Sequence, residues 1–321
     1  MKLTFAPLEG ITGADFRRLH AQMFGGADRY YAPFIAPDPS GCLKVSRLRD
    51  LLPENNAQLP LVPQILANSA YAFLETARQL RDLGYEEINL NVGCPSGTVV
   101  SKHKGAALLA EPEALRRLLD GIYAGSPLPV SVKTRLGFQS TDEFPALLEI
   151  YNDYPIAELT IHARDRAGQY KSVPDRQMLL WALAHSRAPV CCNGNLFRPG
   201  DLAALDGAEC FMLGRGAVMN PALFREIRGG GGLEREELRD FAAALREISR
   251  ERLSAAHTLA WLKELWYYWK WLFPGEKKRL KAIFKARELD DYVEAATALF
   301  ADGAFVPDAR FEGSDTFLFS S

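Results

Sequence analysis

The sequence lacks the features that mark a membrane or a secreted protein. No apolar run approaches the roughly 18 residues of a transmembrane helix, so we expect no membrane span. The first ten residues, MKLTFAPLEG, reach a proline and a glutamate too early for a secretory signal peptide. Excess charge of one sign is also missing: the net charge is −2, so any nucleic-acid binding must come from a local patch. With 48% hydrophobic and 24% charged residues, the 321-residue chain is typical of a globular enzyme with one large core.

Cysteine is scarce as well. The five cysteines form no CxxC pair and have no histidine at ligand spacing, which argues against a disulfide framework and a zinc site. A reducing cytoplasm is the natural location, and we expect a monomer without a metal ion. Cys191, Cys192 and Cys210 lie in apolar runs and are expected in the core. Cys94, placed between a glycine and a proline, does not fit that description.

Short apolar, β-branched runs alternate with longer helical patterns along most of the chain. The expected strands are 3–7, 28–35, 60–66, 86–91, 129–134, 158–162, 188–193 and 209–214. Ser69 can cap a helix over 69–84, and Pro112 suits the first turn of a helix over 111–125. Eight strands, each followed by a helical segment, predict an α/β fold, a (β/α)8 TIM barrel over residues 1–228. A doubly wound open sheet is the alternative, but the first strand continues APLEGITGAD and not GxGxxG.

Four consecutive glycines at 229–232 cannot hold a helix and are interpreted as a linker. Strand signals are missing beyond them, and only helical patterns occur, which predicts an all-helical C-terminal domain over 233–300. The last segment, 301–321, is an irregular tail that either packs on another element or is loose.

Polar side chains end most of the expected strands. Because the carboxyl ends of barrel strands converge on one rim, where barrel enzymes keep their active sites, these side chains are candidates to line a polar, planar ligand. The segments NGN (193–195) and GRG (214–216) follow the seventh and eighth strands, where barrels often bind phosphate, and Arg215 can add a charge-assisted bond. Lys133, inside an apolar strand, needs either an electron-rich ligand such as a reduced flavin or a carboxylate such as Glu9.

These motifs, in order, resemble those of the tRNA-dihydrouridine synthases. The segments that carry the resemblance are APLEGIT, NVGCP, KGAALL, VSVKTRLGF, IHAR, NGN and MLGRGA, over roughly residues 3–227. The family consists of FMN-dependent flavoproteins with a barrel and a C-terminal helical domain. This chain departs from the common pattern at Leu8, where methionine is usual, at Asn89, where aspartate is usual, and at 97–98, where a lysine is often found.

The resemblance implies reduction of the uridine C5–C6 bond in tRNA, with NADPH as the reductant. It makes Cys94 the general acid that protonates C5, while the hydride goes from reduced FMN to C6. The implied FMN contacts are Pro7, Leu8, Glu9, Gln64, Lys133, His162, Asn193, Gly194, Asn195, Gly214 and Arg215. The expected RNA contacts are Asn91, Lys102, Lys104, Arg164, Lys277, Lys278 and Lys281. For the loop SKHKG (101–105) a solvated basic turn is the alternative.

The helical region interleaves basic and aromatic residues. Between 261 and 287 lie Lys263, Lys270, Lys277, Lys278, Arg279, Lys281, Lys285 and Arg287, together with Trp261, Trp266, Trp269 and Trp271. Such a surface suits RNA, since cations contact phosphates and aromatic rings stack on bases. The alternative is a helix packed between domains with solvated lysines, and some of the tryptophans must be core.

Three competing functions stay open at this stage. The enzyme could reduce uridines in ribosomal RNA. It could be a small-molecule FMN oxidoreductase of the dihydroorotate dehydrogenase or ene-reductase kind, although the helical region and its basic residues argue against that. It could also be a non-catalytic RNA-binding barrel, against which the set Cys94, Lys133 and His162 argues.

Overall fold

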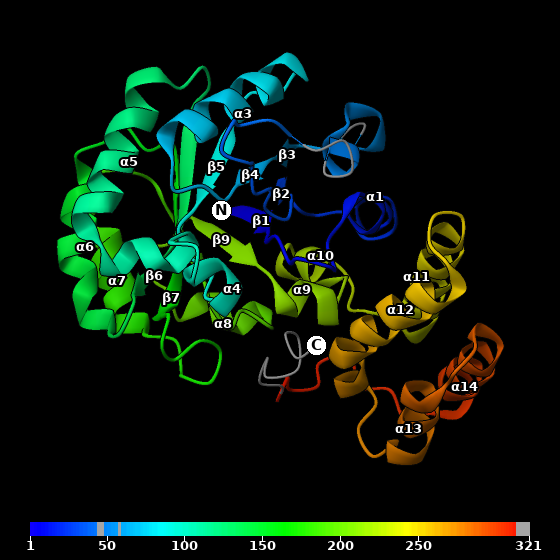
Figure 1. Cartoon of the computed structure of the whole chain (residues 1–321). Helices are drawn as coiled ribbons and strands as arrows, with labels where there is room; N and C mark the ends of the chain where they lie inside the picture. The colour runs from blue at the N-terminus through cyan, green and yellow to red at the C-terminus, as the bar shows by residue number, and fades with distance from the viewer. Residues whose placement is uncertain (44–47, 57–58, 313–321) are drawn as a thin grey trace.

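A computed structural model describes residues 1–43, 48–56 and 59–312 as a parallel β/α barrel followed by helices (Figure 1). The strands are β1 Lys2–Phe5, β2 Arg29–Tyr31, β3 Leu61–Val62, β4 Gln64–Ile65, β5 Ile88–Asn91, β6 Val130–Gly137, β7 Leu159–Asp165, β8 Val190–Asn193 and β9 Cys210–Leu213. The α-helices around the barrel are α1 Ala14–Met23, α3 Ala70–Asp82, α4 Gly97–Val100, α5 Pro112–Gly125, α6 Phe144–Asn152, α7 Arg176–His185, α8 Pro199–Ala203, α9 Arg215–Met219 and α10 Leu223–Ile227. The later ones are α11 Arg235–Arg250, α12 Ala255–Trp269, α13 Lys277–Lys285 and α14 Leu289–Asp302. Short 3₁₀ turns are η1 Arg49–Leu51, η2 Pro53–Asn55, η3 Gly105–Ala110, η4 Thr141–Glu143 and η5 Lys270–Leu272.

The sheet closes on itself. Its strand order is β3-β2-β1-β9-β8-β7-β6-β5-β4, and each neighbouring pair is parallel. The two end strands, β3 and β4, are halves of one stretch interrupted at Pro63, which has no amide hydrogen to give to a ladder. The predicted barrel is therefore confirmed. Helices surround the strands on the outside (Figure 1).

Local signals placed several elements correctly. Ser69 caps α3 by accepting a hydrogen bond from the amide of Ala72 at 3.4 Å, and Gly84 follows that helix with φ +92°. Pro112 occupies the first turn of α5. Cys191, Cys192 and Cys210 are buried, as expected of core cysteines.

Strand lengths differ from the sequence prediction in two ways. The second strand, expected over 28–35, is regular only over β2; the ladder is interrupted at Pro33, which has no amide hydrogen, and pairing resumes at Ile35, which bridges Ile65. The strands β6 and β7, expected to end at 134 and 162, continue to Gly137 and Asp165. The additional residues continue the ladder between the two strands, in which Arg135 pairs with His162 and Gly137 with Asp165.

The later helices share a hydrophobic core with the barrel. Phe241 of α11 packs edge-on against Phe16 and Phe24, with ring centroids 5.4 and 5.2 Å apart. The fully buried Trp269 of α12 donates from Nε1 to the carbonyl oxygen of Val218 at 2.9 Å. Such apolar contacts and a satisfied indole N–H favour a fixed placement of the helices on the barrel. The division into domains at 228 and 233 stays a prediction.

The glycine stretch is held in place by the chain around it. Arg225 of α10 donates to the carbonyl oxygens of Gly231 and Gly232, each at 2.9 Å, and pairs with Glu237 of α11 at 2.7 Å. After α14 the chain has neither helix nor strand up to residue 312. In the part of the chain that the structure describes, none of the helices has the length and apolar character needed to cross a bilayer.

We expect Trp269→Ala to lower the free energy of unfolding by about 3–5 kcal/mol, because it leaves a cavity between the barrel and α12. Trp261→Ala is the control, since this partly exposed indole makes one hydrogen bond to the Gly10 carbonyl oxygen and should cost about 1 kcal/mol. Urea unfolding followed by circular dichroism measures both. Equal effects of the two variants would contradict a core shared through Trp269.

Candidate active site

A cavity opens at the carboxyl ends of the barrel strands, and we call it the rim cavity. It is lined by Ala6, Pro7, Leu8, Lys133, His162, Tyr170, Asn193, Gly194, Asn195, Leu196, Phe197, Met212, Gly214, Arg215 and Gly216. All the predicted cofactor contacts except Glu9 and Gln64 are among them. Residues far apart in the sequence therefore meet at one place because the strands converge.

The rim cavity is cationic. Within the described residues no acceptor lies at hydrogen-bonding distance from Lys133 Nζ, and burial together with the Arg135 charge lowers the pKa of Lys133 to about 8. Burial and the charges of Arg135 and Lys133 lower the pKa of His162 well below 6.5, so this imidazole is neutral at neutral pH. Arg164 and Arg215 contribute to the same field, whereas none of the described lining residues is acidic. This arrangement suits an anionic ligand.

Hydrogen bonds with Asn195 and Arg164 hold the side chains of Arg215 and His162 in position at the rim cavity. Arg164 Nη1 lies 3.1 Å from His162 Nε2, and because a guanidinium can only donate, Nε2 is the acceptor and the ring proton is on Nδ1. Asn195 Oδ1 accepts from Arg164 Nη2 at 3.0 Å and from Arg215 Nη2 at 2.9 Å. Arg164 is only 2% exposed and supports the cavity in this structure, and its contact with RNA stays a prediction.

Glycines allow the two segments predicted to bind phosphate, 193–195 and 214–216, to approach each other. A Cβ on Gly216 would collide with the carbonyl oxygen of Leu196. Gly194 adopts φ +131°, and a Cβ there would lie 3.3 Å from the His162 ring. The backbones of the loops after β8 and β9 are therefore in close contact. Because Gly194 and Gly216 have no side chains, the backbone of these loops can also come close to a ligand.

Gln64, the first exception, lies inside the barrel in a chain of side-chain amides. Its Nε2 donates to Asn89 Oδ1 at 2.8 Å, and Asn89 Nδ2 donates to Ser131 Oγ at 3.0 Å. Gln64 Oε1 accepts from Asn91 Nδ2 at 2.7 Å. Asn91 Oδ1 in turn accepts from the amides of Gly93 and Cys94, at 3.0 and 2.9 Å. Asn91 therefore holds the Cys94 loop, and its contact with a nucleotide stays a prediction.

Cys94 is fixed at the rim by contacts on both sides. Arg135 Nε donates to the Gly93 carbonyl oxygen at 2.9 Å, and the amide of Ala106 donates to the Cys94 carbonyl oxygen at 3.0 Å. Gly105, with φ +59°, packs so closely that a Cβ would lie 2.9 Å from that oxygen. Burial raises the pKa of the Cys94 thiol, so the sulfur carries its proton at neutral pH.

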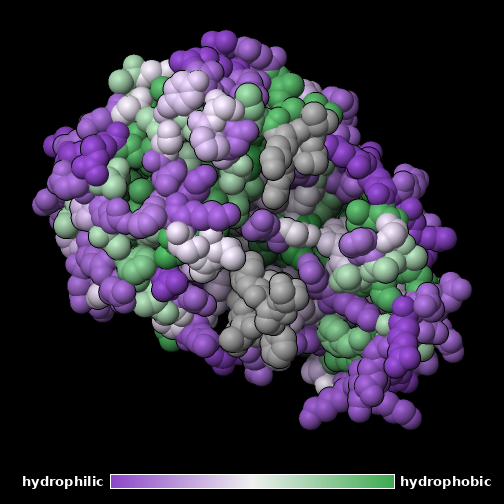
Figure 2. Space-filling model, viewed as in Figure 1, coloured by the Kyte–Doolittle hydropathy of each residue, from purple (hydrophilic) through white to green (hydrophobic). Residues whose placement is uncertain are grey.

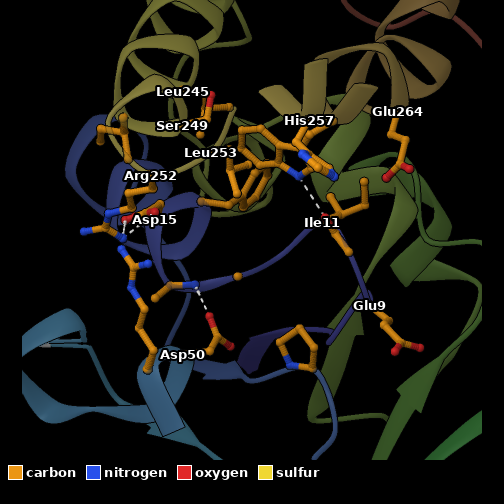
Figure 3. A pocket seen from close by; sticks show the side chains of 18 of the residues that line it. Glu9, Ile11, Asp15, Asp50, Leu245, Ser249, Arg252, Leu253, His257 and Glu264 are labelled. Carbon is orange, nitrogen blue, oxygen red and sulfur yellow. Dashed lines mark hydrogen bonds and ion pairs between the residues drawn. The ribbon is translucent and has the colours of Figure 1, made fainter. Parts of the chain in front are cut away.

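Glu9, the second exception, lines a larger cleft of about 580 Å³ between the barrel rim and the helices α11 and α12 (Figure 3). Its walls are largely apolar and include Ile11 and Leu245. Trp261 Nε1 bridges the two sides by donating to the Gly10 carbonyl oxygen at 2.8 Å. The charge of Glu9 acts on the Cys94 thiol, so this cleft and the catalytic rim adjoin. We call it the interdomain cleft.

The five lysines among the predicted RNA contacts fall into two separate groups. Lys102 is exposed and Lys104 half-buried beside α4, and burial with the Lys102 charge lowers the pKa of Lys104. Lys277, Lys278 and Lys281 are exposed on α13. Figure 1 places α13 on the far side of the helical region from the barrel, and Figure 2 shows hydrophilic surface there. Of the tryptophans, Trp266 and Trp269 are buried core residues.

Sequence reasoning missed Tyr170 and Arg135. Tyr170, from the loop after β7, lines the rim cavity with the Arg135 guanidinium 5.3 Å and the Arg215 guanidinium 4.3 Å from its ring centroid. Only its aromatic character in a polar loop could have drawn attention to it. Arg135 follows the same period-two pattern as Lys133 and could have been found once the strand was extended.

The barrel floor brings Glu158, Cys191 and Cys210 together, with possible ligand atoms within 4.8 Å of one another. The carboxylate already accepts from Lys2 Nζ at 2.6 Å and Tyr31 Oη at 2.9 Å. These partners account for a buried carboxylate. The expectation that the protein holds no metal stays a prediction.

Comparisons with known proteins show the family to which the chain belongs. The family model described as Dihydrouridine synthase (Dus) matches residues 4–298. A probable tRNA-dihydrouridine synthase of Staphylococcus aureus is 32% identical over 234 residues, covering 69% of this chain and 70% of that protein. A tRNA-dihydrouridine(16) synthase of Pseudomonas putida is 31% identical over 265 residues, covering 78% and 81%. A solved morphinone reductase variant in complex with tetrahydroNAD shares the fold, at 11% identity and a TM-score of 0.50, over 72% of this chain and 87% of that one. Because the family model matches most of its length, the chain belongs to the dihydrouridine synthase family.

Proposed function

We propose that this protein is a tRNA-dihydrouridine synthase that binds FMN in the rim cavity and protonates the uracil ring from Cys94. The observation that carries the proposal is a cysteine whose loop is held by Asn91 and Arg135 beside a cationic cavity. The names of the Staphylococcus aureus and Pseudomonas putida relatives support tRNA as the substrate.

The residues of the rim cavity fit FMN. Arg215, Asn195 and the glycine backbones at 194 and 216 would hold the phosphate, since guanidinium and amide donors suit its oxygens. Lys133, without a carboxylate partner among the described residues, would lie against the electron-rich edge of the ring. FMN, when bound, supplies the hydride that adds to C6 of the uracil, and NADPH is the proposed reductant.

Cys94 supplies the second part of the reduction, a proton from Sγ to C5. Because burial raises the pKa of the Cys94 thiol, the thiol holds this proton at neutral pH. After the transfer, the charges of Arg135 and Lys133 stabilise the remaining thiolate. Water then returns a proton to the sulfur. The interdomain cleft beside Glu9 gives a path by which the target base reaches the rim, and the energy of unstacking that base is offset by phosphate contacts elsewhere.

The exposed lysines of α13 favour an RNA substrate over a free pyrimidine or another small molecule. Ribosomal RNA is distinguished from tRNA by mapping dihydrouridine in both RNAs from a deletion strain. Since the Pseudomonas putida relative is named for position 16, that uridine is the first to examine. Loss of dihydrouridine from ribosomal RNA alone would contradict the proposal.

Cys94→Ala should keep flavin content and reduction by NADPH near wild type and slow uridine reduction by about a hundred- to ten-thousand-fold. Single-turnover oxidation of the reduced enzyme by tRNA measures that step. In the wild type the thiol should keep its proton between about pH 6 and 8, because burial raises its pKa, so a fall in the rate caused by Cys94 is expected only at higher pH. A fall near pH 8 would instead report the loss of the Lys133 charge. An unchanged rate in the variant would remove Cys94 from the mechanism.

Arg215→Ala should weaken FMN binding by about tenfold or more, because a charge-assisted bond to phosphate is lost. The flavin retained after gel filtration and a fluorescence titration report the affinity. Arg176→Ala, an exposed arginine of α7, serves as the control and should bind as the wild type does. Equal FMN affinity in all three proteins would show that the phosphate lies elsewhere.

Charge reversal at Lys277, Lys278 and Lys281 should weaken tRNA binding and flatten its dependence on salt. Three lost phosphate contacts correspond to a slope reduced by roughly 2 in log affinity against log salt. Reversal of Arg78, Arg81 and Arg116, exposed on outer barrel helices, changes the net charge equally and controls for it. Identical slopes for the two triple variants would turn the search for RNA contacts to Lys102 and Lys104.

A further inference from the structure

We propose that the interdomain cleft binds a second base of the substrate RNA, a guanine that neighbours the target uridine, and that Glu264 of α12 recognises this guanine. The inference rests on the proposed function, because it takes RNA as the substrate. It goes further by giving the cleft a ligand of its own, beside the uracil that passes to the rim. Its basis is the wall that α12 contributes to the cleft (Figure 3).

One face of α12 forms this wall. The helix contributes His257, Ala260, Trp261 and Glu264 to the lining, and their spacing of three and four residues places them on the same side. The indole of Trp261 is held in place because its Nε1 donates to the Gly10 carbonyl oxygen at 2.8 Å. A partly exposed indole in a fixed orientation offers a ring on which a base can stack with little loss of side-chain freedom.

Glu264 brings a carboxylate into the cleft without a partner. Figure 3 shows its side chain extending from α12 toward the barrel side, and a Cβ built on Gly10 would lie 3.6 Å from Glu264 Oε2. Within the residues that the structure describes, none donates a hydrogen bond or presents a cation to this carboxylate. The residue is exposed overall, but the cleft withdraws its carboxyl group far enough from water to raise its pKa. Such a group is stabilised when a ligand supplies N–H donors.

The charges of the lining favour a base over a phosphate. Among the described lining residues carboxylates outnumber guanidiniums, four to two: Glu9, Asp15, Asp50 and Glu264 against Arg49 and Arg252. Arg252 is already paired with Asp15 at 2.5 Å. This balance repels phosphates, whereas the apolar walls suit the flat faces of a base and the carboxylate suits its N–H edge. At about 580 Å³ the cleft is in the size range of pockets that hold small molecules, so a whole base has room there.

Guanine is the base whose edge fits this carboxylate. Its Watson–Crick edge carries two adjacent donors, N1–H and the 2-amino group, which can bond both oxygens of Glu264 at once. Adenine and cytosine instead place a ring acceptor beside their amino group, and uracil has one donor between two acceptors. Because Glu9 lines the cleft and its charge acts on the Cys94 thiol, the cleft adjoins the reaction site. The guanine is therefore expected next to the target uridine in the RNA.

The test measures the binding of three labelled pentaribonucleotides to the full-length protein with its flavin, by fluorescence anisotropy. All have a central uridine flanked by adenosines, and two of them carry a guanosine directly before or directly after it. The wild type should bind one guanosine RNA about tenfold or more tighter than the adenosine RNA, the discrimination of a bidentate pair. Glu264→Gln, which keeps the shape and loses one acceptor, should remove most of this preference. Glu294→Gln, at an exposed residue of α14 outside the cleft, is the matched control and should retain it.

Inosine in place of the guanosine separates recognition by Glu264 from a structural effect. Inosine lacks only the 2-amino group, so it should weaken binding to the wild type and change little in Glu264→Gln. Equal affinities of the wild type for the three RNAs, or the same preference in Glu264→Gln as in the wild type, would overturn the inference. If the wild type still reduces tRNA in that case, the proposed function stands and only the second base is wrong. If it neither reduces tRNA nor discriminates among the RNAs, the proposed function fails as well.

Discussion

The constraint on which the site depends is the burial of cations at the rim without a carboxylate among the lining residues that the structure describes. Lys133 lies within the strand β6, two residues before Arg135, and both cations lower the pKa of His162. Removing such groups from water costs several kcal/mol unless an opposite charge compensates. An anionic ligand is the natural compensation, and the fold supplies the place for it because β6, β7 and the chain after β9 end at the same rim.

The position of the Cys94 thiol depends on a second constraint, a series of hydrogen-bonded polar side chains inside the barrel. A chain of hydrogen bonds links Ser131 of β6 to Asn89 of β5, and Asn89 to Gln64 of β4. It continues from Gln64 to Asn91 of β5 and ends at the Cys94 amide, which donates to Asn91. Each of these buried side chains is satisfied by the next, so the loss of one would leave its neighbours unpaired. The asparagine at 89, where the family commonly has aspartate, fits because it donates to Ser131 and accepts from Gln64 at the same time.

The helices past the glycine stretch do more than carry an exposed basic face. Phe241 and Trp269 bury their rings against the barrel, and Trp261 bridges to the rim beside Glu9. The basic α13 and the reaction site therefore belong to parts of one packed core. If an RNA binds at both places, as we propose, it would be held in a defined orientation, which suits the proposed reaction of one uracil beside Cys94.

The sequence by itself predicted the barrel, the helical region after residue 233 and most of the residues that line the rim cavity. These follow from local patterns: strand periodicity, the Ser69 cap and polar residues at strand ends. Only the tertiary structure decided the rest. It buried Arg164, turned Asn91 toward the Cys94 loop, and brought Tyr170 and Phe311 to Arg215. Tyr170 and Phe311 come from irregular segments, whose paths are set by long-range packing and not by any periodic pattern in the chain. Arg164 and Asn91 belong to the strands β7 and β5, but the partners of their side chains come from other segments and depend on the packing.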